Sequence, residues 1–300
     1  MDIYVRPGDS FWYYSQLFRI PLQLIIDSNR NINPQTIQQG QRIQIPGYVA
    51  QNYQIKSGDS LWSIARIRNL PLDTLFLINP MLNPNRLQIG QTIQVPLRIT
   101  WRLVNGKQNY DYEVMMKDLQ KLQTVYPFLQ ISSIGNSVLN RGIPEVLIGI
   151  GDKRVTYNGS FHANEWITTP TIMTFLNDYA LSLTNQTTIR GLITSPLYEQ
   201  TSLSIVPMVN PDGVNLVLNG PPELEPYRSN VIKWNNNSLD FSGWKANING
   251  VDLNDQFPAQ WEKERDRNPK TPGPRDYGGE SPLSQPESIA MADLTRRRNF

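Results

Sequence analysis

Residues 5–12 read VRPGDSFW, and the same pattern returns at residues 55–62 as IKSGDSLW. A second pair of segments keeps this spacing, INPQTIQQGQRIQIP at 32–46 and LNPNRLQIGQTIQVP at 82–96. Aligned without a gap from the first segment to the second, the two copies share 15 identities in 42 positions. Because similarity at a fixed period is the signature of a duplicated unit, the first hundred residues are predicted to hold two copies of one small fold.

Each copy reads as strand, helix, helix and strand. In the first copy a glycine, an aspartate and a serine at residues 8–10 end the opening strand. The aspartate or the serine can cap a helix that begins at residue 11. Pro21 suits the first turn of a second helix, which is expected to end near Asn29. Residues 40–46 then alternate polar and apolar side chains, as a half-buried strand does.

Each copy also carries one tryptophan, Trp12 or Trp62, at the second position of its first predicted helix. Large aromatic side chains are mostly buried in folded proteins. Both tryptophans are therefore expected in the core of their copy.

The order of elements and the GDS–W, N–NP and GQ-I-Q-IP signatures resemble the LysM family over both copies, here bounded at 2–47 and 52–97. LysM modules bind glycans that contain N-acetylglucosamine, such as peptidoglycan and chitin. The resemblance implies a groove between the loop after the first strand and the loop after the second helix. Turn and capping chemistry explains the same loop residues equally well. The implied glycan-binding residues are Gly8, Asp9, Ser10 and Asn29 in the first copy and Gly58, Asp59, Ser60 and Asn79 in the second. Two linked copies favour avidity on a repeating polymer.

Composition limits the remaining possibilities. The chain has 300 residues, of which 39% are hydrophobic and 18% charged, as in folded soluble domains. No apolar stretch reaches the roughly 20 residues that span a bilayer. There is no cysteine and one histidine, and the net charge of +2 is too small to indicate a nucleic-acid partner. Residues 1–98 hold nine basic and five acidic side chains, whereas the remainder is net negative, which places a domain boundary near residue 100.

The remaining residues, 100–300, are predicted to form one α/β domain with a largely parallel or mixed central sheet, because strands alternate with helices. Residues 284–287, SQPE, carry a capping-box signature. The expected helices lie at 111–126, 169–183 and 285–298, and the expected strands at 145–150, 154–161 and 202–208.

The chemistry of this domain is concentrated in SFHANEW at residues 160–166. His162 and Glu165 lie three residues apart after a predicted buried strand, where one turn brings imidazole and carboxylate to the same side. Histidine and glutamate are common zinc ligands. A lone His-x-x-Glu arises often by chance, and a histidine with only structural contacts is the alternative.

Three further segments follow in order, PMVNPDGV at 207–214, NGVDLNDQF at 249–257 and PLSQPES at 282–288. Together with the histidine segment they resemble the zinc carboxypeptidase (funnelin) family, most of all its bacterial branch of γ-D-glutamyl-L-diamino acid endopeptidases. That resemblance implies a Zn²⁺ ion held by His162 and Glu165.

The resemblance also implies substrate contacts. Asn254 matches an asparagine that helps to hold the terminal carboxylate of the substrate. Asp255 stands where ordinary carboxypeptidases have an arginine that clamps this carboxylate, so it is expected to bind an ammonium group of the diamino acid instead. The alternative is that Asp255 only caps a turn. Lys245 lies near the expected oxyanion-stabilising arginine, but the local length differs and a solvated lysine fits as well.

Two departures from the family affect the expected activity. The family's third zinc ligand is a histidine downstream of the SQPES helix, and its general acid/base glutamate lies further on. This chain has neither, so the sequence predicts a carboxy-terminal truncation, an unpaired edge beside the strand before His162, and doubtful activity of the 300 residues alone.

The predicted function is that of a LysM-anchored zinc metallopeptidase acting on peptidoglycan. It would hydrolyse the bond between γ-D-glutamate and the diamino acid, meso-diaminopimelate, of the stem peptide. The alternative is a non-catalytic peptidoglycan-binding protein with a degenerate peptidase domain. The amino terminus lacks a secretory signal. Cytoplasmic synthesis and action on spore or cell-wall peptidoglycan, as in the sporulation members of this branch, are therefore expected.

Overall fold

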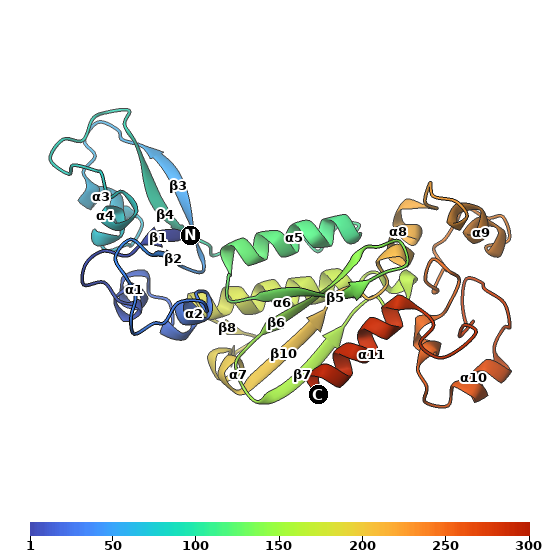
Figure 1. The fold of residues 1–300 in the computed structure, drawn as a ribbon. Coiled ribbons are helices and arrows are strands. Elements are labelled where there is room, and N and C mark those ends of the chain that lie inside the picture. Colours follow the sequence, from blue (N-terminus) through green and yellow to red (C-terminus); the bar gives the residue numbers. More distant parts are fainter. The chain divides into compact units, whose positions relative to one another are not determined.

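The computed structural model describes all 300 residues, and Figure 1 shows the course of the chain. The chain divides into two compact units. The first contains Met1–Leu103 with residues 120–129 and 177–195, and the second contains the rest. The long helices α5 (Tyr112–Val125) and α6 (Thr168–Asn185) contribute residues to both units. None of the helices combines the length and the apolar character needed to cross a bilayer.

The first unit contains the two repeats, and each has the predicted order of strand, helix, helix and strand. In each repeat the two strands pair antiparallel. The first repeat comprises β1 (Asp2–Tyr4), α1 (Phe11–Phe18), α2 (Leu22–Asp27) and β2 (Arg42–Gln44). The second comprises β3 (Tyr48–Gln54), α3 (Leu61–Ile67), α4 (Asp73–Ile78) and β4 (Thr92–Arg98).

Local capping explains why the first helix of each repeat starts where it does. The Ser10 hydroxyl accepts a hydrogen bond from the backbone N–H of Tyr13, and Ser60 does the same for Ser63. Such side-chain caps satisfy amides that the helix leaves unpaired. Gly8 and Gly58, with φ of 82° and 84°, form the left-handed turn before each cap.

The tryptophan prediction is wrong. Trp12 is 63% exposed and Trp62 is 57% exposed. In α1 the buried side chains follow one helical stripe that begins with Phe11, Tyr14 and Phe18. A residue one position after Phe11 is rotated by about 100° out of that stripe, so Trp12 faces solvent.

The two repeats are also joined to each other by a polar bridge within the first unit. The guanidinium of Arg6 pairs with the carboxylate of Asp73 through two contacts, at 2.9 and 2.5 Å. The hydroxyl of Tyr13 donates to the same carboxylate at 2.6 Å. The bond from Arg6, against the cost of partial burial, lowers the pKa of Asp73. Bidentate pairing of this kind fixes orientation as well as distance.

The second unit is built on a four-stranded mixed sheet in the order β5-β6-β10-β7. The first two pairings are antiparallel, and β10 runs parallel to β7. β7 therefore lies at one edge of the sheet. The strands are β5 (Gln130–Asn136), β6 (Gly142–Ile148), β7 (Lys153–Asn158) and β10 (Thr201–Val206).

Shorter elements complete the chain, and most of them surround the carboxyl ends of β7 and β10. They are the 3-10 turns η1 (Ala163–Glu165) and η2 (Leu253–Gln256), the hairpin β8 (Thr188–Ile189) and β9 (Leu192–Ile193), and the helices α7 (Ser195–Gln200), α8 (Pro211–Asn219), α9 (Tyr227–Trp234), α10 (Trp261–Arg267) and α11 (Pro286–Arg298).

Helix α11 lies across the sheet of the second unit (Figure 1). Its apolar residues Ala290, Met291 and Leu294 pack with Ile143 of β6 and Val206 of β10. The predicted helix is confirmed, but the capping box is wrong. Gln285 occupies the N-cap without a side-chain bond, because the Ser284 hydroxyl donates instead to the side chain of Gln256.

Candidate functional site

The loop that carries His162 is placed by the two parallel strands. After β7 the amide of Gly159 bonds to Val206 at the end of β10, and Val209 bonds back to Gly159. Gly159 has no space for a side chain, because a Cβ atom there would lie 2.8 Å from the carbonyl oxygen of Pro207. Hydrogen bonds thus hold the carboxyl ends of β7 and β10 together, and His162 follows β7 as the N-cap of η1.

His162 lies between two carboxylates. Its Nδ1 atom is 3.1 Å from Oε1 of Glu165, and its Nε2 atom is 3.2 Å from Oδ1 of Asp252. The other oxygen of Asp252 is 3.1 Å from the ammonium of Lys245, which also lies 3.4 Å from Asp276. Asp252 is only 1% exposed, so one buried carboxylate joins the imidazole to the ammonium.

The charges of this group stabilise one another. Burial disfavours ionised Asp252, but the bond with His162 and the ammonium of Lys245 outweigh it and lower its pKa to about 2. The hydrogen bond to Asp252 in turn raises the pKa of His162, against the effect of burial. Burial lowers the pKa of Lys245, but the charge of Asp252 reverses this effect and raises it overall.

The donors present fit two positions of a zinc site. A carboxylate on one ring nitrogen of a histidine is the usual device that fixes the tautomer of a metal ligand. A proton on Nε2, donated to Asp252, would leave the lone pair of Nδ1 facing Glu165. A catalytic zinc ion takes three protein ligands. No group of three histidine, cysteine, aspartate or glutamate side chains in residues 1–300 is placed to hold a metal ion together, so these residues supply one ligand fewer.

The two predicted substrate-binding residues follow Asp252 directly on η2. Asn254 is exposed, and its amide N–H donates to Asp252, which caps the turn. Asp255 is half-buried, and its carboxylate accepts a hydrogen bond of 3.0 Å from the side chain of Asn268. Burial and then the charge of Asp252 raise the pKa of Asp255, so an arriving cation would stabilise its ionised form.

In the repeats, Asn29 and Asn79 have internal roles. The amide of Asn29 donates to a carbonyl of α2 and to the carbonyl of Gln44, and it accepts from the Gln44 N–H at 2.8 Å. Asn79 makes the same three bonds with α4 and Gln94. A glycan contact by these side chains would have to displace bonds that tie the second helix to the last strand. These bonds give both asparagines a structural role, and glycan binding by them stays a prediction.

The loop aspartates are also engaged within the repeats. Asp9 accepts from the backbone N–H of Arg6 at 3.2 Å, and Asp59 accepts from that of Lys56 at 2.8 Å. A tyrosine hydroxyl donates to each of them. The serines cap the helices and the glycines form the turns, so residues 8–10 and 58–60 all have an observed role in turn formation or capping. Glycan binding by Asp9 and Asp59 stays a prediction.

Two acidic residues of the site were missed at the level of sequence. Asp252 lies inside the quoted NGVDLNDQF segment, but its pairing with His162 spans ninety positions and no local pattern indicates it. Asp276 comes from a loop that resembles no motif. The need of a metal-binding histidine for a carboxylate partner was the one signal that pointed to Asp252.

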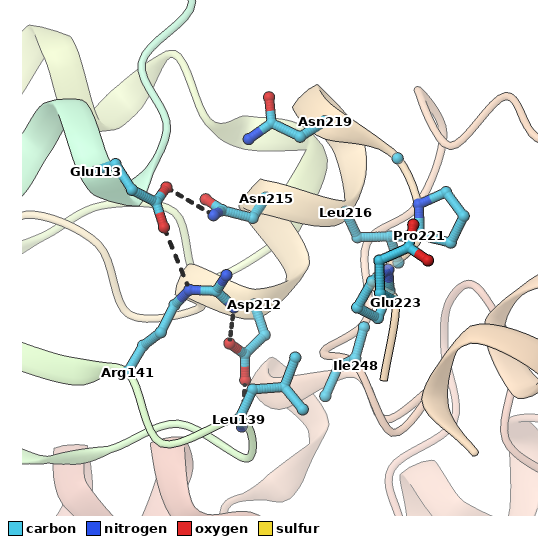
Figure 2. A pocket seen from close by; sticks show the side chains of 12 residues that line it. Glu113, Leu139, Arg141, Asp212, Asn215, Leu216, Asn219, Pro221, Glu223 and Ile248 are labelled. Atoms are coloured by element: carbon cyan, nitrogen blue, oxygen red, sulfur yellow. Dashed lines mark hydrogen bonds and ion pairs between the residues drawn. The ribbon is translucent and has the colours of Figure 1, made fainter. Parts of the chain in front are cut away.

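A separate cavity of about 270 Å³ lies in the second unit (Figure 2). Arg141 pairs there with buried Asp212 at 2.7 Å, and Asn215 donates to Glu113 at 2.8 Å. Figure 2 also shows the backbone of Leu139 bonded to Asp212. None of the residues around His162 lines this cavity.

Comparison with known proteins gives two family matches. The model of the zinc carboxypeptidase family matches residues 115–300, and the LysM domain model matches residues 3–46 and 53–96. Among solved structures, carboxypeptidase A from Helicoverpa armigera is 17% identical with a TM-score of 0.47, and the alignment covers 84% of this chain and 67% of that one.

Two curated relatives are similar over longer stretches of sequence. Gamma-D-glutamyl-L-diamino acid endopeptidase 1 of Lysinibacillus sphaericus is 77% identical over 300 residues, which are all of this chain and 76% of the relative. Uncharacterized protein YqgT of Bacillus subtilis (strain 168) is 44% identical over 201 residues, 66% of this chain and 53% of that protein. The chain therefore belongs to the zinc carboxypeptidase family and carries two LysM domains ahead of its peptidase domain.

Proposed function

We propose that this chain binds peptidoglycan through its LysM repeats and presents a zinc peptidase site to the bond between γ-D-glutamate and the diamino acid of the stem peptide. The observation that carries the proposal is the 77% identity, over every residue of the chain, to a relative named for that activity. The acidic side chain of Asp255 beside the site supports a substrate that brings an ammonium group.

The arrangement supports a role for each side chain of the site. Zinc, when bound, would polarise the scissile carbonyl and lower the pKa of a water molecule. His162 and Glu165 would hold the ion, and Asp252 keeps the imidazole in the tautomer that this requires. The Lys245 ammonium, fixed by Asp252, would face the negative charge that develops on the carbonyl oxygen. Asn254 and Asp255 would orient the stem peptide.

A second candidate is a peptidoglycan-binding protein without turnover. The ligand count favours it, because two protein ligands leave a zinc ion mostly coordinated by water. Cytoplasmic synthesis and a role in sporulation also remain predictions.

Incubation of the purified 300-residue chain with zinc and muropeptides distinguishes the two candidates. The ligand count predicts binding of stem peptides in calorimetry but no hydrolysis products in mass spectrometry. Turnover that a chelator abolishes would contradict this expectation and establish the peptidase directly. A chain that neither binds nor cleaves stem peptides would overturn both candidates.

The exposed tryptophans give a test of glycan binding. Trp12 and Trp62 occupy matching positions on the two repeats, and large exposed aromatics are typical of binding surfaces. We expect the double variant Trp12→Ala/Trp62→Ala to lose binding to insoluble peptidoglycan by about 100-fold, and each single variant by about 10-fold, because the second site acts at high effective concentration. Tyr4→Ala is the control, since Tyr4 is another aromatic of the first unit, 60% exposed. Equal losses for Tyr4→Ala would show that the tryptophans have no special role.

A further inference from the structure

Lys245 and Asp252 stand at the two ends of one tight loop. The backbone N–H of Asn247 bonds to the carbonyl of Val251 at 2.8 Å and closes the loop. The side-chain oxygen of Asn247 accepts from the N–H groups of Asn249 and Val251 at 3.0 and 3.1 Å. One fully buried amide therefore sets the distance between the ammonium and the carboxylate at the His162 site.

The other end of this amide is held by the first turn of α11. The Nδ2 group of Asn247 donates to Oε1 of Gln285 at 2.9 Å and to Oε2 of Glu287 at 3.3 Å. Gln285 is 8% exposed, and Glu287 and Asn247 are fully buried. All the hydrogen-bonding atoms of the Asn247 side chain are thus used, and buried groups of this kind are costly to leave unpaired.

The second oxygen of Glu287 holds another loop. Oε1 accepts from the N–H of Val138 at 3.1 Å, and the next N–H, that of Leu139, donates to Asp212 at 2.8 Å. Figure 2 shows this contact beside the pair formed by Arg141 and Asp212. Both oxygens of Glu287 face donors, so the position needs a side chain that accepts twice, which a carboxylate does and an amide does not.

We propose that Glu287, acting through Asn247, is a positioning residue that holds the Lys245–Asp252 loop against His162. The loop also contacts the histidine segment directly, because the carbonyl of Lys245 accepts from the N–H of Ala163 at 2.9 Å. The proposal rests on the assignment of the functional site to His162, but it concerns the free chain and needs neither metal nor substrate.

Glu287→Gln tests the proposal. The glutamine must turn its NH₂ group toward either the N–H of Val138 or the Nδ2 group of Asn247, and both of these are donors, so one of the two hydrogen bonds is lost. The readout is the ring ¹⁵N spectrum of His162, which is the one imidazole of the chain. Because the hydrogen bond to Asp252 raises the pKa of His162, spectra are recorded without metal at increasing alkaline pH until the ring signals no longer change and the imidazole is neutral. Burial raises the pKa of Glu287 to about 7, so its carboxylate is ionised there. The two nitrogen signals lie far apart while Asp252 holds one tautomer, and we expect them to converge in the variant.

A double variant and a matched control complete the experiment. Asn247→Asp combined with Glu287→Gln restores the pattern, because the new carboxylate accepts from the new amide, and it should return the wild-type separation. Glu145→Gln is the control. Glu145 is an equally buried carboxylate that bonds to Ser204 and Arg298, outside this loop. It should lower stability without moving the His162 signals.

The outcomes separate positioning from general stability. Convergence in Glu287→Gln, recovery in the double variant and no change in Glu145→Gln support the proposal. Unchanged His162 signals in a folded Glu287→Gln variant overturn it, as does convergence of equal size in the control. If Glu287→Gln does not fold, Asn247→Asp alone decides, because its carboxylate would face that of Glu287 in place of the donated bond. Unchanged signals in that variant also overturn the proposal. The experiment measures no hydrolysis. Its result can therefore be interpreted even if the proposed peptidase function is wrong.

Discussion

An Asp252→Asn variant is expected to lose about 2 kcal/mol of its free energy of unfolding near pH 5. The ordinary pKa of 3.8 falls to about 2 in the folded chain, and a tenfold change in an acid dissociation constant corresponds to about 1.4 kcal/mol. A lowered carboxyl pKa gives stability that is present above the unfolded value and is lost as the pH falls through the folded one. The wild type should therefore lose this contribution between about pH 4 and pH 2, and the variant has none of it to lose.

His162, the partner of Asp252, sets the upper end of the pH range in which the stability difference is largest. The raised pKa of His162 gives stability that is present below its unfolded value and is lost as the pH rises through the folded value. The deficit of the variant should therefore be largest at intermediate pH and shrink toward both ends. Urea unfolding at acidic, intermediate and alkaline pH measures it.

Asp276→Asn is the matched control for this measurement. Asp276 also contacts Lys245, but its side chain is 47% exposed. Exposed ion pairs contribute about 0–1 kcal/mol, so the control should change little at any pH. A deficit in Asp252→Asn that is independent of pH, or one of the same size in the control, would contradict the buried link between His162 and Lys245.

An Asp255→Asn variant is expected to bind free-amine stem peptides about 5- to 150-fold more weakly, as the loss of a charge-assisted contact of about 1–3 kcal/mol requires. In its ionised form the half-buried carboxylate would repel the carboxylate of an ordinary peptide and would attract the side-chain ammonium of meso-diaminopimelate. Asparagine keeps the shape and can still accept from Asn268, so the variant removes mainly the charge. Calorimetry on the 300-residue chain measures the loss.

Stem peptides with an acetylated side-chain amine provide the comparison. They carry no ammonium, and their affinity should be nearly the same for the wild type and the variant. Asp266→Asn removes an exposed carboxylate from α10 and serves as the charge control, with no expected effect on either peptide. Equal losses on both peptides in Asp255→Asn would show that Asp255 serves the fold and does not read the diamino acid.

Elements that depend on neighbouring residues could be predicted from the sequence. The GDS segments cap the helices that follow them, and the spacing of apolar residues located α5 closely. The SQPE signature located α11, although the capping box itself does not form. The prediction for Trp12 failed because it used the average burial of tryptophan. The stripe formed by Phe11, Tyr14 and Phe18 was visible in the sequence and placed Trp12 on the other side.

Contacts between distant segments were beyond sequence reasoning. His162 and Glu165 are three residues apart, and their proximity follows from one turn. Asp252 reaches the same imidazole only after β7, β10 and the loop before η2 are in place. The internal bonds of Asn29 and Asn79 were equally hidden, because each side chain makes three bonds to its own repeat and one partner in each case lies 15 positions away.

The bridge from Arg6 and Tyr13 to Asp73 has a consequence for how this duplication can evolve. At the corresponding positions of the other repeat stand Lys56, Ser63 and Gln23, so the contact exists in one direction only. A gene in which the two coding units were exchanged would encode the same two repeats but would lose the bridge between them. The two descendants of one ancestral module have thus become a first and a second member, because the contact depends on the order in which they stand in the chain.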